Sequence, residues 1–85
     1  MKGHRPSKYV VSIRHRNCVG VLADILRVIR DDGNNVEKME NIIFADAQGA
    51  CANIQIDDQM SHKALVKLQN ISDDVFDVNL STIED

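Results

Sequence analysis

Residues 42–56 read IIFADAQGACANIQI, and the fold can be worked out from this stretch. From residue 50 onward, apolar Ala and Ile alternate with Cys, Asn and Gln, which is the pattern of a strand with one buried face. Residues 46–49, DAQG, have the composition of a hairpin turn that ends in glycine. Residues 35–45 suit a preceding strand, but their apolar side chains occupy both faces, which indicates a bulge or partial burial on each side. The centre of the chain therefore predicts an antiparallel hairpin.

A strand and then a helix are predicted before the hairpin. Residues 8–15 alternate, and a loop over residues 16–19 leads into a helix from about Gly20 to Asp32. Apolar residues recur in the helix at i, i+3, i+4 and i+7. They form one stripe of Leu22, Ile25, Leu26 and Ile29. Gly33 is a natural residue to end this helix.

A second helix and a last strand are predicted after the hairpin. Asp58 or Ser61 can cap the helix, and a turn at residues 72–74 follows it. The last strand is expected to bury Phe76, Val78 and Leu80. The order β-α-β-β-α-β predicts an α+β, ferredoxin-like sandwich, in which a four-stranded antiparallel sheet of order 4-1-3-2 has both helices on one face. The second and fourth strands are then the edges.

Composition limits the classes of protein that the chain can belong to. Its 85 residues predict one domain over residues 8–85, after a linker or trimmed end at residues 1–7. One tyrosine, two phenylalanines and no tryptophan imply an aliphatic core. The net charge of −3 and scattered basic residues argue against a nucleic-acid partner, and no apolar run could span a membrane. Two cysteines without a Cys-x-x-Cys motif indicate neither a disulfide framework nor a metal site, so a cytoplasmic location is expected.

The segment with the most chemical information is residues 15–22, HRNCVGVL, between the first strand and the first helix. Gly20 allows the backbone to approach a ligand closely. The start of a helix offers unpaired N–H groups and a positive dipole end, which suit a carboxylate. His15 and Asn17 add side-chain donors. The segment can therefore hold a small anionic amino acid, although a plain loop in which Asn17 caps the helix explains the same residues.

This loop resembles the signature of ACT domains, in which Asp or Asn precedes a basic residue, Pro, Gly and an aliphatic pair. Residues 33–36, Gly-Asn-Asn-Val, are similar to the Gly-x-Asn-Ile that opens the second strand in that family. The fuller form, His-x-Asn-x-x-Gly-Val-Leu followed by Gly-x-Asn-Val, is similar to the C-terminal regulatory ACT domain of the phosphoglycerate dehydrogenase group. Residues 36–44 also resemble bacterial members of that group, and the resemblance covers residues 8–83.

The resemblance implies a regulatory domain that binds an amino acid, L-serine in the dehydrogenases, between two copies paired through their second strands. His15 and Asn17 of one copy and Asn35 of the other, with the Val36 backbone beside it, would then contact the ligand. The full set of implied site residues is His15, Asn17, Cys18, Val19, Gly20, Val21, Leu22, Asn35 and Val36. Cys18 and Val19 replace the basic residue and the proline of the family. The domain would have no cofactor of its own, because NAD belongs to the catalytic part of such an enzyme.

Two other hypotheses remain open. The chain could be an interaction module that forms a homodimer or higher oligomer through an edge strand and binds no small ligand. Such a module needs none of His15, Asn17 and Asn35. It could also be a small enzyme of the same fold, such as an acylphosphatase, but residues 16–20, RNCVG, match a phosphate-binding loop poorly. Isolated protein is expected to show no dehydrogenase activity, because it lacks a Gly-x-Gly-x-x-Gly nucleotide motif.

Overall fold

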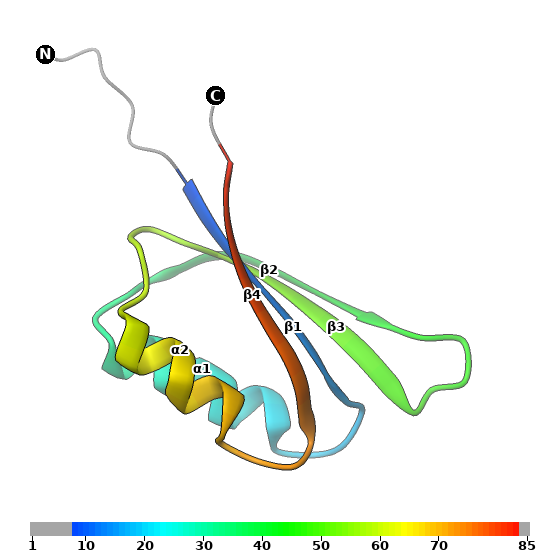
Figure 1. Ribbon diagram of the computed structural model, residues 1–85. Coiled ribbons are helices and arrows are strands. Elements are labelled where there is room, and N and C mark those ends of the chain that lie inside the picture. Colours follow the sequence, from blue (N-terminus) through cyan, green and yellow to red (C-terminus); the bar gives the residue numbers. More distant parts are fainter. Residues whose placement is uncertain (1–7, 84–85) are drawn as a thin grey trace, which may run out of the picture.

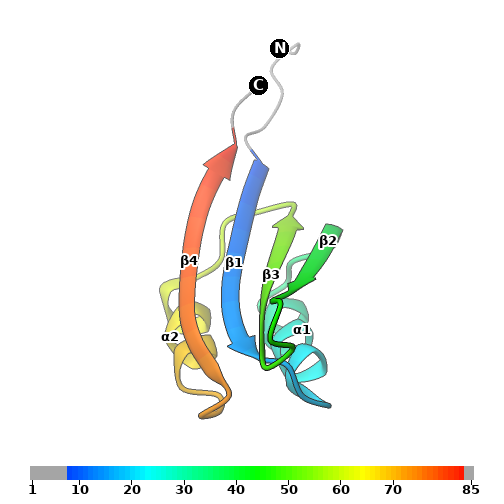
Figure 2. The same cartoon turned by 90° about the vertical axis from the view of Figure 1, so that its right-hand side faces the viewer.

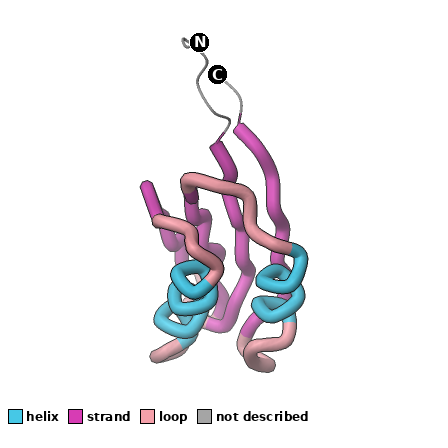
Figure 3. Tube along the Cα trace, turned by 90° about the vertical axis from the view of Figure 1, so that its left-hand side faces the viewer, coloured by secondary structure: helices cyan, strands magenta, loops and turns pink. Residues whose placement is uncertain are grey.

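A four-stranded antiparallel sheet carries both helices on one of its faces in the computed structural model, which describes residues 8–83 (Figures 1 and 3). The elements are β1 (Lys8–Arg16), α1 (Val21–Asp31), β2 (Val36–Ile43), β3 (Gly49–Ile56), α2 (His62–Gln69) and β4 (Val75–Ile83). The strands lie in the order β2-β3-β1-β4, which is 4-1-3-2 counted from the opposite edge (Figure 2). As expected, β2 and β4 are the edges.

Strand β3 has the alternation that the sequence predicts. Its residues are half-buried and buried in turn from Gly49 to Ile56. It pairs antiparallel with β1 on one side and with β2 on the other. The turn between β2 and β3 closes through hydrogen bonds from the Phe44 N–H to the Gly49 carbonyl and from the Ala47 N–H to the Phe44 carbonyl, at 2.9 and 2.8 Å. The predicted hairpin is confirmed.

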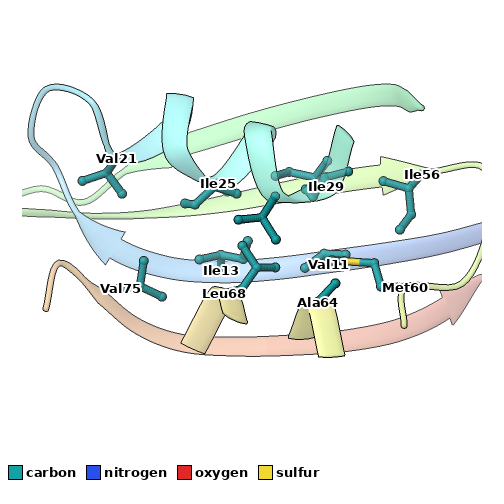
Figure 4. Packing of buried hydrophobic residues seen from close by; sticks show 13 residues of the cluster. Val11, Ile13, Val21, Ile25, Ile29, Ile56, Met60, Ala64, Leu68 and Val75 are labelled. Atoms are coloured by element: carbon teal, nitrogen blue, oxygen red, sulfur yellow. The ribbon is translucent and has the colours of Figure 1, made fainter. Parts of the chain in front are cut away.

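The core between the sheet and the helices is aliphatic. Ile13 of β1, Ile56 of β3, Ile25 of α1 and Leu68 of α2 are fully buried, and their side chains belong to one cluster (Figure 4). Both phenylalanines, Phe44 and Phe76, are exposed and lie outside this core. Burial of a large aliphatic side chain contributes about 1.5–3 kcal/mol, so these positions supply most of the fold's stability. None of the helices described within residues 8–83 is long and apolar enough to cross a membrane.

The expected burial of Phe76 is wrong, and a bulge explains why. Arg14 of β1 pairs with Asp77 but the next residue, His15, pairs with Val75, so the register shifts by one residue beside Phe76. Val75 therefore turns into the core at 8% exposure, while Phe76 is 54% exposed. The Arg16 guanidinium lies over the Phe76 ring, with its Cζ 5.7 Å from the ring centroid, as a cation–π contact. Val78 and Leu80 keep their predicted inward side and pack against the core.

Both helix boundaries near the candidate site differ slightly from expectation. Helix α1 begins at Val21, with Gly20 as its N-cap residue, and ends at Asp31. Gly33 follows with φ +86°, and its N–H donates to the Arg30 carbonyl at 2.9 Å. This left-handed conformation is the reason for a glycine at the end of the helix. Of the two candidates for capping α2, the structure selects Ser61, whose Oγ accepts from the Ala64 N–H at 3.1 Å.

Strand β2 is shorter than the predicted residues 35–45 and packs little on either face. It spans Val36–Ile43, and seven of its eight residues are exposed, Asn41 being half-buried. The register shifts between Val36 and Lys38, which is the irregularity that its mixed pattern indicated. Its outer edge has no partner strand among residues 8–83. An open edge of this kind invites pairing with another chain.

Candidate functional site

The turn between β1 and α1 leaves the start of the helix open. Gly20 has φ +92°, a left-handed conformation that glycine adopts without strain. No side chain caps the helix at this residue. Because the first N–H groups of a helix have no partner within the helix, this end of α1 presents donors and a positive dipole end to solvent.

Asn17 ties the turn to the β2–β3 hairpin. Its N–H donates to the Gln48 carbonyl at 2.8 Å, and its side-chain Nδ2 donates to the Ala47 carbonyl at 3.0 Å. The alternative in which Asn17 caps the helix is therefore wrong. Val19 is fully exposed beside it, so an apolar side chain projects into solvent next to the open helix start.

Cys18 is exposed in the same turn, and its surroundings favour the thiol. Desolvation, and then the charge of Asp74 and a hydrogen bond to it, raise the pKa of the Cys18 thiol, while Arg16 acts in the opposite direction. Arg16 is itself held by Asp74 through its Nε at 2.9 Å. A raised pKa makes the thiolate scarcer at neutral pH, which is contrary to the stabilised thiolate that a helix start can produce. Cys18 is thus an exposed loop residue whose surroundings favour the protonated thiol.

His15 lies beneath the turn instead of lining its surface. Its side chain is 2% exposed on the helix side of β1. The ring Nδ1 is 2.9 Å from the Arg16 carbonyl oxygen, and Nε2 is 3.0 Å from Oδ1 of Asn41 in β2. With both nitrogens occupied, His15 connects the end of β1 to the edge strand. This position suits a residue that supports a ligand site from below.

Asn35 and Val36 lie at the far end of β2 from the turn. Asn35 precedes the first residue of the strand, whereas Asn17 contacts the hairpin turn beyond the last. The N–H and the Nδ2 of Asn35 both donate to the carboxylate of Asp57, each at 3.0 Å. A single chain therefore does not bring the two halves of the predicted site together. Val36 is 42% exposed and available to a partner.

The hydrogen bonds to Asp57 predict a pH dependence for the position of Asn35. The backbone N–H and then the side chain of Asn35 lower the pKa of the Asp57 carboxyl. Because the folded chain has the lower pKa, the resulting stabilisation is complete above the ordinary value of about 4 and is lost as the pH falls through the lowered one. We expect the NMR shift of the Asn35 amide to titrate below the midpoint of Asp57 in the urea-unfolded chain, and Asp57→Asn to abolish that titration. Equal midpoints would contradict this.

A groove that the sequence did not indicate runs between α1 and β2. It is lined by residues of both elements and of the segment between them, among them Leu26, Arg27, Arg30, Asn34, Val36 and Met39. The two arginines have the positions expected of cations near a helix C-terminus, and this explanation left no reason to look for a site there. No group of three or more His, Cys, Asp or Glu within residues 8–83 could hold a metal ion.

The fold and the open turn define a small α+β domain with a four-stranded antiparallel sheet and two helices on one face. The fold is similar to part of a solved homoserine dehydrogenase from Thiobacillus denitrificans (TM-score 0.72, 22% identity), covering 93% of this chain and 18% of that one. It is also similar to the C-terminal domain of the MgtC protein from Mycobacterium tuberculosis (TM-score 0.69, 12% identity), covering 99% of this chain and 95% of that one. No protein-family model and no curated protein sequence matches the chain. At these identities the similarity shows the fold, and the chain spans less than a fifth of the dehydrogenase.

Proposed function

We propose that the chain is a regulatory domain of the ACT type, which binds an amino acid between two copies of itself. L-serine is the favoured ligand and a cytoplasmic phosphoglycerate dehydrogenase the favoured parent enzyme, on the resemblance of residues 15–22 and 33–36. The similarity of the fold to part of a homoserine dehydrogenase supports an oxidoreductase as the parent. The domain itself would then supply regulation, while NAD and catalysis belong to the rest of the enzyme.

The proposal depends chiefly on the open edge of β2, because antiparallel pairing through this edge would unite the two half-sites. If the β2 strands of two copies pair antiparallel with Met39 opposite Met39, the first residues of each strand lie opposite the last residues of the partner strand. Asn35 then comes beside the partner's Ile43, next to the partner's β2–β3 turn to which Asn17 is bonded. The same register sets Lys38 opposite the partner's Glu40, twice per dimer, which is a favourable cross-strand pairing.

Each site residue has a definite part in this arrangement. The ligand carboxylate would meet the open N–H groups of residues 20–22, where the helix dipole favours negative charge. Asn17 of one copy and Asn35 of the other would hold the polar groups of the ligand. His15 would not touch the ligand but would fix the floor of the site through Asn41. Because two copies share one ligand, ligand binding would tighten the dimer.

Asn35→Ala tests the shared site. Hydrogen bonds to a charged group contribute about 1.5–3 kcal/mol. Asn35→Ala should therefore weaken serine binding by roughly one to two orders of magnitude. Its effect on stability should be small, because Asn35 is exposed at a strand start. Isothermal titration calorimetry with a panel of amino acids measures the affinity, and analytical ultracentrifugation with and without serine measures the dimer. Asn79→Ala, at an exposed position in β4, is the matched control.

A pure interaction module is the second candidate, and two observations favour it. The ring nitrogens of His15 already have partners, and Asn35 is already bonded to Asp57. Under this alternative, the dimer dissociation constants with and without serine would be equal for both the wild type and Asn35→Ala. A panel in which no amino acid binds would agree with it and would overturn the ligand-binding proposal.

A further inference from the structure

The groove between α1 and β2 has the size and the lining of a ligand site. Its volume is about 520 Å³, and sites for small molecules are typically about 300–1,000 Å³. It belongs to one chain, so it exists without the dimer of the proposed function. It shares Asn35, Val36 and Met39 with the proposed interface, and its other lining residues come from α1 and the segment after α1.

One wall of the groove is aliphatic and partly exposed. Leu26 of α1 is half-buried, and Val36 and Met39 of β2 are 42% and 41% exposed. Since β2 is an edge strand with α1 on one side, no further strand or helix among residues 8–83 covers these side chains. An apolar ligand body of a few carbons would remove them from water, which is favourable in proportion to the apolar area that is covered.

Two cations lie beside this wall, and their present partners hold them weakly. Arg27 is 3.8 Å from Asp24, and Arg30 donates from Nε and Nη2 to Oδ1 of Asp31 at 3.3 and 3.1 Å. Their side chains are 63% and 75% exposed, and ion pairs between exposed groups on one helix contribute little. Both guanidinium groups are therefore available to an anion, and Arg suits a planar carboxylate because it can donate two parallel hydrogen bonds.

Asn34, which also lines the groove, has an unused acceptor. The residue is 6% exposed, and its Oδ1 has no hydrogen-bond partner within the described residues. Its Nδ2 is 3.5 Å from Oδ2 of Asp32, at the limit of a hydrogen bond. A buried polar group without a partner is costly, but this oxygen is enclosed by the chain itself, so the ligand argued for below does not contact it.

We propose that this groove binds a small aliphatic carboxylate, of the size and shape of an amino acid with a branched apolar side chain. The aliphatic body packs on Leu26, Val36 and Met39, and the carboxylate meets Arg27 and Arg30. This ligand class differs from serine, whose hydroxymethyl group has little to gain from an apolar wall.

NMR titration of the labelled chain tests this proposal with four probes: L-leucine, 4-methylpentanoate, 4-methylpentanamide and L-serine. We expect saturable shifts at residues of α1 and β2 around the groove with the two carboxylates that have an aliphatic body. The amide and serine should bind at least about fivefold more weakly, since the first lacks the charge and the second the apolar body. Tighter binding of leucine than of 4-methylpentanoate identifies an amino acid as the natural class, and equal binding identifies a simple carboxylate.

The double variant R27Q/R30Q should weaken binding of 4-methylpentanoate by about five- to tenfold. The matched control is K63Q/K67Q, which removes two cations from α2 and should leave binding unchanged. Equal affinity for the amide and the carboxylate, or equal binding by the wild type and R27Q/R30Q, would overturn the proposal. Shifts at the groove that follow protein dilution but no probe would also overturn it, since a second copy of the chain would then be the occupant. Failure of serine to bind at the β1–α1 turn would leave this result untouched.

Discussion

Replacing Ile13 by Ala should lower the free energy of unfolding by about 2–5 kcal/mol, because the side chain is fully buried in the centre of the sheet. Ile13 pairs with Ala52 of β3 on one side and with Val78 of β4 on the other, and both helices pack over it (Figure 4). The cavity that the alanine variant would leave therefore has few ways to collapse. A domain of this size has a total stability of only about 5–10 kcal/mol. Urea denaturation followed by circular dichroism measures the change.

Two further variants make this result interpretable. Ile13→Val removes one methylene group and should cost about 0.5–1.5 kcal/mol, so it gives a measurable value if the alanine variant does not fold. Ile83→Ala makes the same chemical change at a position that is 46% exposed, and it should cost much less than Ile13→Ala. Equal losses at positions 13 and 83 would contradict the described placement of the core.

Exchanging charges on β2 should first break and then restore the dimer. In the register centred on Met39, Lys38→Glu sets two carboxylates opposite each other at two places, and Glu40→Lys does the same with two ammonium groups. Cross-strand charge pairs contribute about 0.2–1 kcal/mol each, so the loss of two pairs in each single variant should weaken the dimer by about 2- to 30-fold, and the repulsion between like charges adds to this. The double variant K38E/E40K recovers opposite charges and should dimerise nearly as well as the wild type. Sedimentation equilibrium at low salt measures all four proteins.

Salt provides the control for the charge exchange. Screening shortens the reach of exposed charges, so the differences among the four proteins should shrink at high ionic strength. A double variant as weak as the single ones would exclude this register. Wild-type protein that stays monomeric at high concentration would exclude pairing through β2 altogether, and with it the proposed interface site.

The parts of the fold that follow local rules were predictable. The alternation in residues 50–56 is a strand pattern in any context, and Gly33 ends its helix because it has a left-handed conformation. The inward side of Phe76 was predicted wrongly because simple alternation assumes an unbroken register. Val75 and Val78 are three residues apart, a spacing that fits a bulged strand, and this was the available signal.

The candidate site was only partly predictable, because its geometry depends on contacts between distant segments. The open turn at Gly20 follows from residues 15–22 alone. His15 has the same parity as the buried Val11 and Ile13, so the alternation of the strand indicates its inward side. Its contact with Asn41, which is 26 residues away along the chain, could not be seen in a local pattern. The groove likewise needs β2 to lie at the edge beside α1, which places Leu26 and Arg30 next to Met39.

The pairing of Lys8 with Ile83 has a mechanical consequence. The described chain enters and leaves the fold at neighbouring positions of two antiparallel strands (Figure 1). A pulling force applied through these two points acts across the ladder between β1 and β4, so its hydrogen bonds would break one after another and not all at once. The domain should therefore yield to small forces at this seam, while the β1–α1 turn, at the opposite end of β1, would be the last part of that seam to feel the load.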